Sequence, residues 1–323
     1  MARVLSRTRV LAVAGAALLA SLGAAGASGA QTPPSDPDQD IATPLADIVV
    51  ERRSLDDATR DFVGEIAAPV RNRGLARWHR GVCVGALSLQ ADAAQYLVDR
   101  VSTVAEDLGL NPGDPGCTPN VIIIGTDDGQ AMARSLVQSR PREFDTNVSG
   151  ANLSDRALEA FQSSDRLIRW WHVSLPVDSE TGDPAVRIPG QCKGACDSVY
   201  DYAPTISVFA ASRLNSQIRD DLRQVIVVVD IDALEMASFE QIADYVAMVA
   251  LAQIDPEAET AGFNTILNLF DPTVATDRFL TDWDTAYLQG LYAADQSQIG
   301  SRRNARSVAS AMADQRLETP ETD

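Results

Sequence analysis

The sequence predicts an α/β (or α+β) domain in which helices pack on a mixed, twisted sheet of about five strands. Two observations support this fold class. Short apolar segments of strand length occur between longer segments whose apolar residues repeat at helical spacing, and loops rich in Pro and Gly separate them. Strands and helices are mixed along the chain with no internal repeat, which indicates one domain built on a central sheet.

The strands are predicted from short apolar or alternating segments. Residues 120–125 (NVIIIG) and 225–230 (VIVVVD) are nearly continuous apolar runs, which is typical of buried strands. Residues 77–87 partly alternate in polarity, as a strand with two different faces does. The remaining predicted strands are residues 167–175 (LIRWWHVSL) and 205–210 (TISVFA).

The helices are predicted from apolar spacing and from capping residues. In residues 90–109 apolar side chains recur every three or four positions until Gly109. Ser238 precedes the strongest helix signal and is a suitable N-cap. Asp282 and Asp284 flank a Trp where another helix opens, and capping explains both acids. The predicted helices span residues 53–67, 90–109, 127–138, 155–162, 239–254, 281 onward and 296–313.

The N-terminal residues predict a secretory signal peptide. Arg3, Arg7 and Arg9 precede an apolar run to about Gly26, and small residues lead to a cleavage site after Ala30. The alternative is a permanent membrane anchor, but an apolar core of about 17 residues, largely Ala and Gly, is short for that role. Export places the mature protein in the bacterial periplasm or the medium. The predicted divisions are a signal peptide at 1–30, a disordered spacer at 31–45, a globular domain at 46–316 and a disordered tail at 317–323.

The composition excludes several classes of function. The net charge is −18, and the signal holds three arginines and no acid, so the mature chain carries −21. This charge repels nucleic acid and anionic lipid, and the sequence has no cluster of Lys and Arg. Lys193 is the only lysine, which excludes a P-loop and Schiff-base chemistry. Neither a dinucleotide motif nor a nucleophile elbow is present, so no cofactor is expected, and no later stretch predicts membrane insertion.

The four cysteines predict two disulfides, because an even number is typical of exported chains. Three connectivities are possible, and we favour Cys83 with Cys117 and Cys192 with Cys196. The second pair would close a tight loop within a surface excursion at residues 176–203. The spacings do not match the C-x-x-C pairs of zinc sites, which argues against a four-cysteine metal site.

Two histidines and several acids are the remaining candidates for chemistry. His79 and His172 each lie near Trp in strand-like segments, where a packed role is more usual than catalysis; a rearranged metal site with both is an alternative. Asp230 and Asp232 follow an apolar strand, and with Asp244 they form a candidate acidic cluster for a divalent cation. A strand leaving the core before a helix would carry the same acids without a metal. No glycosidase pair stands out among so many carboxylates.

The C-terminal part of the chain carries a recognisable order of motifs. A helix begins after Ser238, a turn reads I-L-N-L-F at residues 266–270, and the run L-T-D-W-D-x-x-Y-L-x-x-L-Y extends from Leu280 to Tyr292. This order resembles zincin-type metallopeptidases, in particular a family of exported proteobacterial proteins with zincin-like sequences. The resemblance implies a single zincin-like domain, covering at most residues 77–293, in which the helix would bind zinc and the turn would lie beneath the metal.

The zinc ligands of those peptidases are missing here. Their helix carries H-E-x-x-H, and zinc needs nitrogen or sulfur ligands on that helix face. With Asp244 at the position of the general-base Glu, Ala243 and Ala247 stand at the two histidine positions and Gln253 at the third. The resemblance therefore implies a pseudo-metallopeptidase without bound metal and without predicted catalytic residues.

These observations lead to two expectations about function. The first is an exported, non-catalytic zincin-like protein of the bacterial envelope that binds or scaffolds an envelope protein, a peptide or a glycan. The second is a hydrolase in which Asp230, Asp232 and Asp244 hold a divalent cation, and it requires these carboxylates to converge in one cleft.

Overall fold

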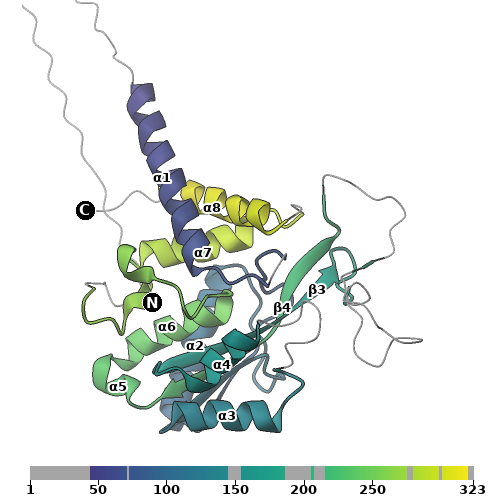
Figure 1. The fold of residues 1–323 in the computed structure, drawn as a ribbon, viewed down its shortest axis with the longest axis vertical. Helices are drawn as coiled ribbons and strands as arrows, with labels where there is room; N and C mark the ends of the chain where they lie inside the picture. The colour runs from purple at the N-terminus through teal and green to yellow at the C-terminus, as the bar shows by residue number, and fades with distance from the viewer. Residues whose placement is uncertain are drawn as a thin grey trace, which may run out of the picture. The chain divides into compact units, whose positions relative to one another are not determined.

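A mixed sheet forms the centre of the fold (Figure 1). The computed structural model describes residues 44–70, 73–144, 154–185, 205–206, 215–274, 279–297 and 300–318. β1, β2 and β4 run parallel, and β3 is antiparallel to β4, so the predicted α/β class with a mixed sheet is confirmed. In this part of the chain the sheet has four strands in the order β1-β2-β4-β3, namely β1 (Val84–Leu87), β2 (Val121–Thr126), β3 (Ile168–Asp178) and β4 (Ile218–Asp230).

Two strands differ in extent from the prediction. The strand expected at 77–87 is regular only from Val84, because the residues before it make isolated bridges to distant segments. β4 begins at Ile218, seven residues before the predicted 225–230, because its first half is charged and does not read as a strand. Of the strand predicted at 205–210, residues 207–210 lie outside the described residues and the other two are not in a strand.

Both faces of β4 are buried, which explains its continuous apolar run. Val225, Val227 and Val229 point to one core, and Ile226 and Val228 to the other. α2 and α6 cover one of these faces, and α3 and α4 cover the other (Figure 1). The helices are α1 (Pro44–Ile66), α2 (Ala91–Asp107), α3 (Gly129–Ser139), α4 (Asp155–Ser163), α5 (Ala233–Met236), α6 (Phe239–Leu251), α7 (Asp282–Ala293) and α8 (Ser301–Glu318).

Helix boundaries follow the capping residues. The Ser238 hydroxyl accepts a hydrogen bond from a backbone N–H group in the first turn of α6, as predicted, and the Thr281 hydroxyl does the same in α7. α1 begins at Pro44, nine residues before the predicted start and inside the predicted spacer. No helix among the described residues is both long and apolar enough to cross a membrane.

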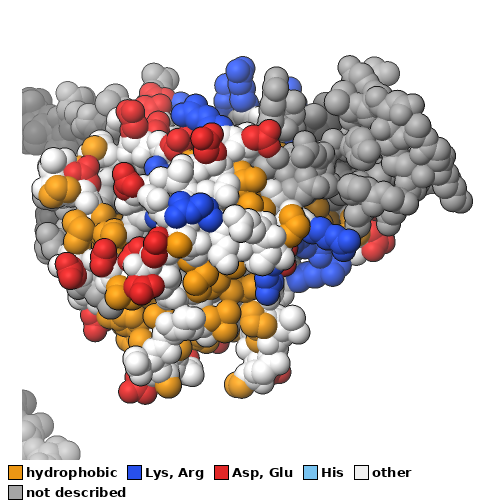
Figure 2. Space-filling view, turned by 60° about the horizontal axis from the view of Figure 1, so that its bottom comes forward, with side chains coloured by type: hydrophobic (Ala, Val, Ile, Leu, Met, Phe, Trp, Pro, Cys, Tyr) orange, Lys and Arg blue, Asp and Glu red, His pale blue; other side chains and the backbone are white. Residues whose placement is uncertain are grey.

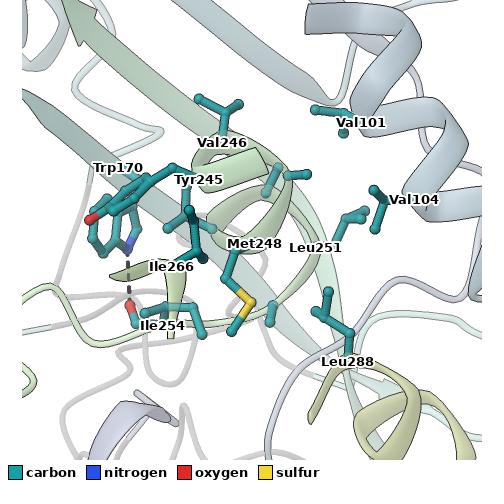
Figure 3. Close-up of a cluster of buried hydrophobic side chains, with 14 of the residues drawn as sticks. Val101, Val104, Trp170, Tyr245, Val246, Met248, Leu251, Ile254, Ile266 and Leu288 are labelled. Carbon is teal, nitrogen blue, oxygen red and sulfur yellow. Dashed lines mark hydrogen bonds between the residues drawn. The ribbon is translucent and has the colours of Figure 1, made fainter. Parts of the chain in front are cut away.

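Helix α6 is the central helix of the larger core. Every residue from Ile242 to Leu251 is buried, so the helix is apolar around its whole circumference, as a fully enclosed helix must be. Figure 3 shows its Val246, Met248 and Leu251 between side chains of α2, α7 and the sheet. This helix therefore contributes packing on all sides.

One predicted disulfide is confirmed. Cys83, just before β1, is bonded to Cys117 in the loop before β2, with a Cα–Cα distance of 6.1 Å. Gly113 lies so close that a Cβ atom there would be 2.5 Å from the Cys117 sulfur, so only glycine fits. Cys192 and Cys196 lie outside the described residues.

Candidate functional site

A cavity of about 580 Å³ opens between β3, α6 and the segment at residues 255–272. Trp170 lines it from β3, Tyr245 from α6 and Phe270 from the segment that follows. The Trp170 and Tyr245 rings meet edge to face with centroids 5.9 Å apart (Figure 3). The centroid of the Phe270 ring lies 5.5 Å from that of Tyr245. These rings form a continuous aromatic wall.

The aromatic wall is held rigidly. The Trp170 indole Nε1 donates a hydrogen bond to the Ile254 carbonyl at 2.9 Å, which fixes the ring against the chain after α6 (Figure 3). Burial raises the pKa of Tyr245 well above its usual value, so its hydroxyl stays protonated. A neutral phenol can donate one hydrogen bond to a ligand and accept others.

The rest of the cavity lining mixes apolar residues with polar ones, and three of the polar ones are acidic. Asp255, Glu259 and Asp271 contribute carboxylates, and Arg166 contributes a guanidinium. Hydrogen bonds from the Thr273 hydroxyl and amide lower the pKa of Asp271, so this carboxylate remains ionised near neutral pH. The cavity therefore combines flat aromatic surfaces with a surplus of hydrogen-bond acceptors.

The floor of the cavity is fixed by an internal amide. Asn268 donates to the carbonyls of Thr260 and Phe263 at 3.0 and 2.7 Å, and its own oxygen accepts from the Thr260 hydroxyl at 2.6 Å. Asn268 is 2% exposed, so its amide lies almost entirely within the protein. A closed network of this kind holds the loop in one conformation.

A buried carboxylate joins this loop to helix α7. Asp284 accepts hydrogen bonds from the Ile266 amide at 2.8 Å and the Thr281 amide at 3.0 Å, and also from the hydroxyls of Thr265 and Thr281. Burial raises the pKa of Asp284 to about 6 despite these donors. The predicted capping role is thus one part of a larger one, because Asp284 also fixes the turn beside the cavity.

The residues that the resemblance would place at zinc-ligand positions have structural roles. Ala243 and Ala247 are fully buried and do not line the cavity; α6 presents Tyr245 to it. Asp244 pairs with Arg100 of α2 and accepts from the Leu280 amide at 3.0 Å. The buried Gln253 accepts from the Ala76 amide at 3.4 Å.

The candidate acidic cluster does not form. Asp230 accepts from the Gly129 amide at 2.9 Å at the start of α3, and from the Asp232 amide at 3.3 Å. Asp244 is turned to Arg100 instead. Among the described residues no three His, Cys, Asp or Glu side chains are placed to hold a metal ion together. Asp230 and Asp244 therefore contact different helices, α3 and α2.

The two histidines lie in different environments. His172 is fully buried in β3, and its Nε2 bonds the Val249 carbonyl of α6 at 2.7 Å. Burial lowers the pKa of His172 to about 4, so the ring is neutral at physiological pH. His79 pairs with Asp221 at 3.2 Å. They have separate partners, and within the described chain no metal-binding group of three ligands contains them.

The burial of His172 predicts a pH-dependent loss of stability. The folded pKa of about 4 lies below the usual 6.5, so stability from the neutral ring is fully present above pH 6.5 and is lost as pH falls through 4. The free energy of unfolding should lose about 3 kcal/mol over this interval. Urea titrations of wild type and His172→Gln from pH 7 to 4 measure it. Parallel pH dependence in the two proteins would refute the assignment.

The cavity residues were missed at the level of sequence. Trp170 and Tyr245 lie in segments predicted as a strand and a core helix, and aromatic side chains there are usually packing residues. Asp255, Glu259 and Phe270 belong to the connection after α6, where single residues carry no distinctive spacing. The available signal was the length of this acidic connection between the helix and the I-L-N-L-F turn.

Comparisons with known proteins give no guide to the role of the cavity. No protein-family model, curated protein or solved structure matches this chain.

Proposed function

We propose that this chain is an exported, non-catalytic zincin-like protein of the bacterial envelope that binds a glycan or peptide in the cavity beside α6. The observation that carries the proposal is the lining of that cavity. Three aromatic rings form one wall, the rest combines three carboxylates, an amide, a hydroxyl and a guanidinium with small apolar side chains, and no histidine is among the described lining residues. Such a lining suits recognition of a ligand more than metal-dependent hydrolysis.

The charge of the cavity favours a neutral or cationic ligand. Asp255, Glu259 and Asp271 face one guanidinium, that of Arg166. Sugar hydroxyls and the N–H groups of a peptide or a basic side chain are donors that such carboxylates accept. Their apolar faces pack on aromatic rings, and a cation near a ring gains further attraction. An anionic ligand would meet repulsion in this cavity.

Catalysis in the manner of a zincin would require different side chains on α6. Ala243 and Ala247 provide no ligand atoms, and both are packed in the core. The alternative hydrolase needs carboxylates that converge on one cation, whereas Asp230 and Asp244 contact different helices. The described geometry therefore favours the binding role over both kinds of catalysis.

Metal analysis tests the non-catalytic part of the proposal. We expect the purified mature protein, dialysed against buffer with micromolar zinc and calcium, to retain less than about 0.1 equivalent of either metal, because Ala243 and Ala247 offer no zinc ligand. Elemental mass spectrometry makes the measurement. Stoichiometric zinc would overturn the pseudo-peptidase interpretation, and stoichiometric calcium would favour the carboxylate hydrolase.

Ligand binding tests the cavity itself. We expect a screen of neutral and basic peptides and neutral oligosaccharides to give a ligand whose binding weakens about tenfold in Phe270→Ala, the loss of one aromatic contact. Phe279→Ala is the matched control, since Phe279 is 48% exposed and does not line the cavity. Isothermal titration calorimetry measures both. Equal weakening in the two variants, or a ligand indifferent to both, would contradict binding at this site.

A further inference from the structure

The cavity beside α6 contains an anionic region and a separate cationic group. Its lining holds three carboxylates and one guanidinium, those of Asp255, Glu259, Asp271 and Arg166. The guanidinium forms no ion pair with these carboxylates or with any other carboxylate in the described part of the chain. Opposite charges that line one cavity without meeting each other suit a ligand that carries both signs.

A buried hydroxyl adds to the cationic end of the cavity. Tyr245 is 6% exposed, and among the described residues its hydroxyl has no hydrogen-bond partner. Burial raises the pKa of this phenol, and the nearby guanidinium of Arg166 opposes that effect. A neutral hydroxyl and a guanidinium that lie close together can both donate to one carboxylate. Arg166 and Tyr245 therefore provide a place for the anionic group of a ligand.

The aromatic wall offers flat faces but few hydrogen-bond acceptors. The Trp170 indole already donates its N–H group to the Ile254 carbonyl, and neither Trp170 nor Phe270 has an acceptor atom in its side chain. A cation is nevertheless attracted to the face of an aromatic ring. A primary ammonium would lose hydrogen bonds to water against this wall, whereas a trimethylammonium group has no N–H donor to leave unsatisfied. The wall therefore favours a methylated ammonium group.

The surrounding charge favours a ligand that includes a cation. The three carboxylates of the lining outweigh its single guanidinium. Acidic side chains are also spread over the face of the molecule drawn in Figure 2, and the chain carries a net charge of −18. Such a field attracts cations and repels free anions. A carboxylate is therefore favoured at Arg166 only when the same ligand also carries a positive group.

We propose that the cavity binds a small zwitterion that carries a trimethylammonium group and a carboxylate. The ammonium group packs on the aromatic wall beside the acidic residues, and the carboxylate accepts from Arg166 and Tyr245. A cavity of about 580 Å³ is within the usual range for small-molecule sites. This proposal rests on the proposed function, in which the cavity is a binding site, and it adds a smaller class of ligand to the glycans and peptides considered there.

Calorimetric titration of the mature protein with three small probes tests the charge requirement. We expect glycine betaine, which carries both groups, to bind. In 3,3-dimethylbutanoate a carbon atom replaces the quaternary nitrogen and removes the positive charge, so it should bind at least about tenfold more weakly. Choline keeps the trimethylammonium group and has a hydroxyl in place of the carboxylate, so its binding should depend little on Arg166.

Three variants locate the two ends of the ligand. Arg166→Gln should weaken glycine betaine about tenfold and change choline binding by less than about twofold, because only the first ligand has a carboxylate. Arg302→Gln is the matched control, since Arg302 is exposed and does not line the cavity, and it should bind both probes as wild type does. Phe270→Ala should weaken both probes about tenfold. Circular dichroism checks that each variant is folded.

The outcomes separate this proposal from the proposed function. Absence of glycine betaine binding, equal affinity for 3,3-dimethylbutanoate, or an equal effect of Arg166→Gln on both cationic probes overturns the zwitterion. If a peptide or oligosaccharide binds with the expected dependence on Phe270 and glycine betaine does not bind, the proposed function stands and this inference fails. If Phe270→Ala changes the binding of no ligand, the cavity is not the binding site and both proposals fail.

Discussion

Asp284→Ala is expected to lower the free energy of unfolding by about 4 kcal/mol at pH 5. The carboxylate accepts from the amides of Ile266 and Thr281 and from two threonine hydroxyls, all in the interior. Each buried donor left without an acceptor costs about 1–3 kcal/mol, and the hydroxyls can reorient where the amides cannot. Urea unfolding followed by circular dichroism gives the difference.

The pH dependence of this loss identifies its source. The pKa of Asp284 is about 6 in the folded protein against 3.8 usually, so its proton-linked stability is fully present below pH 4 and is lost as pH rises through 6. The cost of Asp284→Ala should therefore shrink by about 1 kcal/mol from pH 5 to 7. Asp282→Ala, in the same turn but with its side chain 77% exposed, is the control and should cost less than about 1 kcal/mol. A loss at position 284 no greater than at 282 would contradict the bridging role.

The helices and central strands were predictable because the residues that specify them lie within the element itself. The apolar run that became the second half of β4 is buried on both faces, and α6 begins at Ser238, where the cap was expected. The start of α6 depends on a hydrogen bond within its own first turn. The second half of β4 is buried on both faces, so its apolar residues indicate a strand whichever residues pack against them. Chemistry of this kind is visible in the order of residues alone.

Features that depend on distant partners were not predictable. The first half of β4 contains Asp220 and Asp221, which are typical of a polar loop because their partners Arg73 and His79 lie far away in sequence. The partner of Asp244 was not predictable for the same reason, since Arg100 holds Asp244 across an interhelical contact. Charged residues in a strand are explained only once their partners are known.

The buried ion pair between Arg73 and Asp220 gives the second large prediction. Asp220→Ala should lower the free energy of unfolding by about 3–5 kcal/mol, because it leaves the Arg73 guanidinium buried without a counter-charge. Asp220 also accepts from the Gly74 amide at 2.7 Å, and this bond is lost as well. Burial lowers the pKa of Arg73 and raises that of Asp220, so both ions are strained by desolvation.

A double variant separates two effects on stability: the cost of burying the Arg73 charge without a partner, and the net contribution of the Arg73–Asp220 ion pair. Arg73→Met/Asp220→Leu removes both ions and fills the same space, so it should be several kcal/mol more stable than Asp220→Ala, leaving mainly the cost of the unsatisfied Gly74 amide. Arg60 and Asp57, an exposed pair on α1, serve as the comparison: Asp57→Ala should cost less than about 1 kcal/mol. Chemical unfolding of the four proteins at pH 7 decides the matter. If the double variant proves as unstable as Asp220→Ala, the penalty arises from lost packing and hydrogen bonds, and the first half of β4 does not depend on its buried charges.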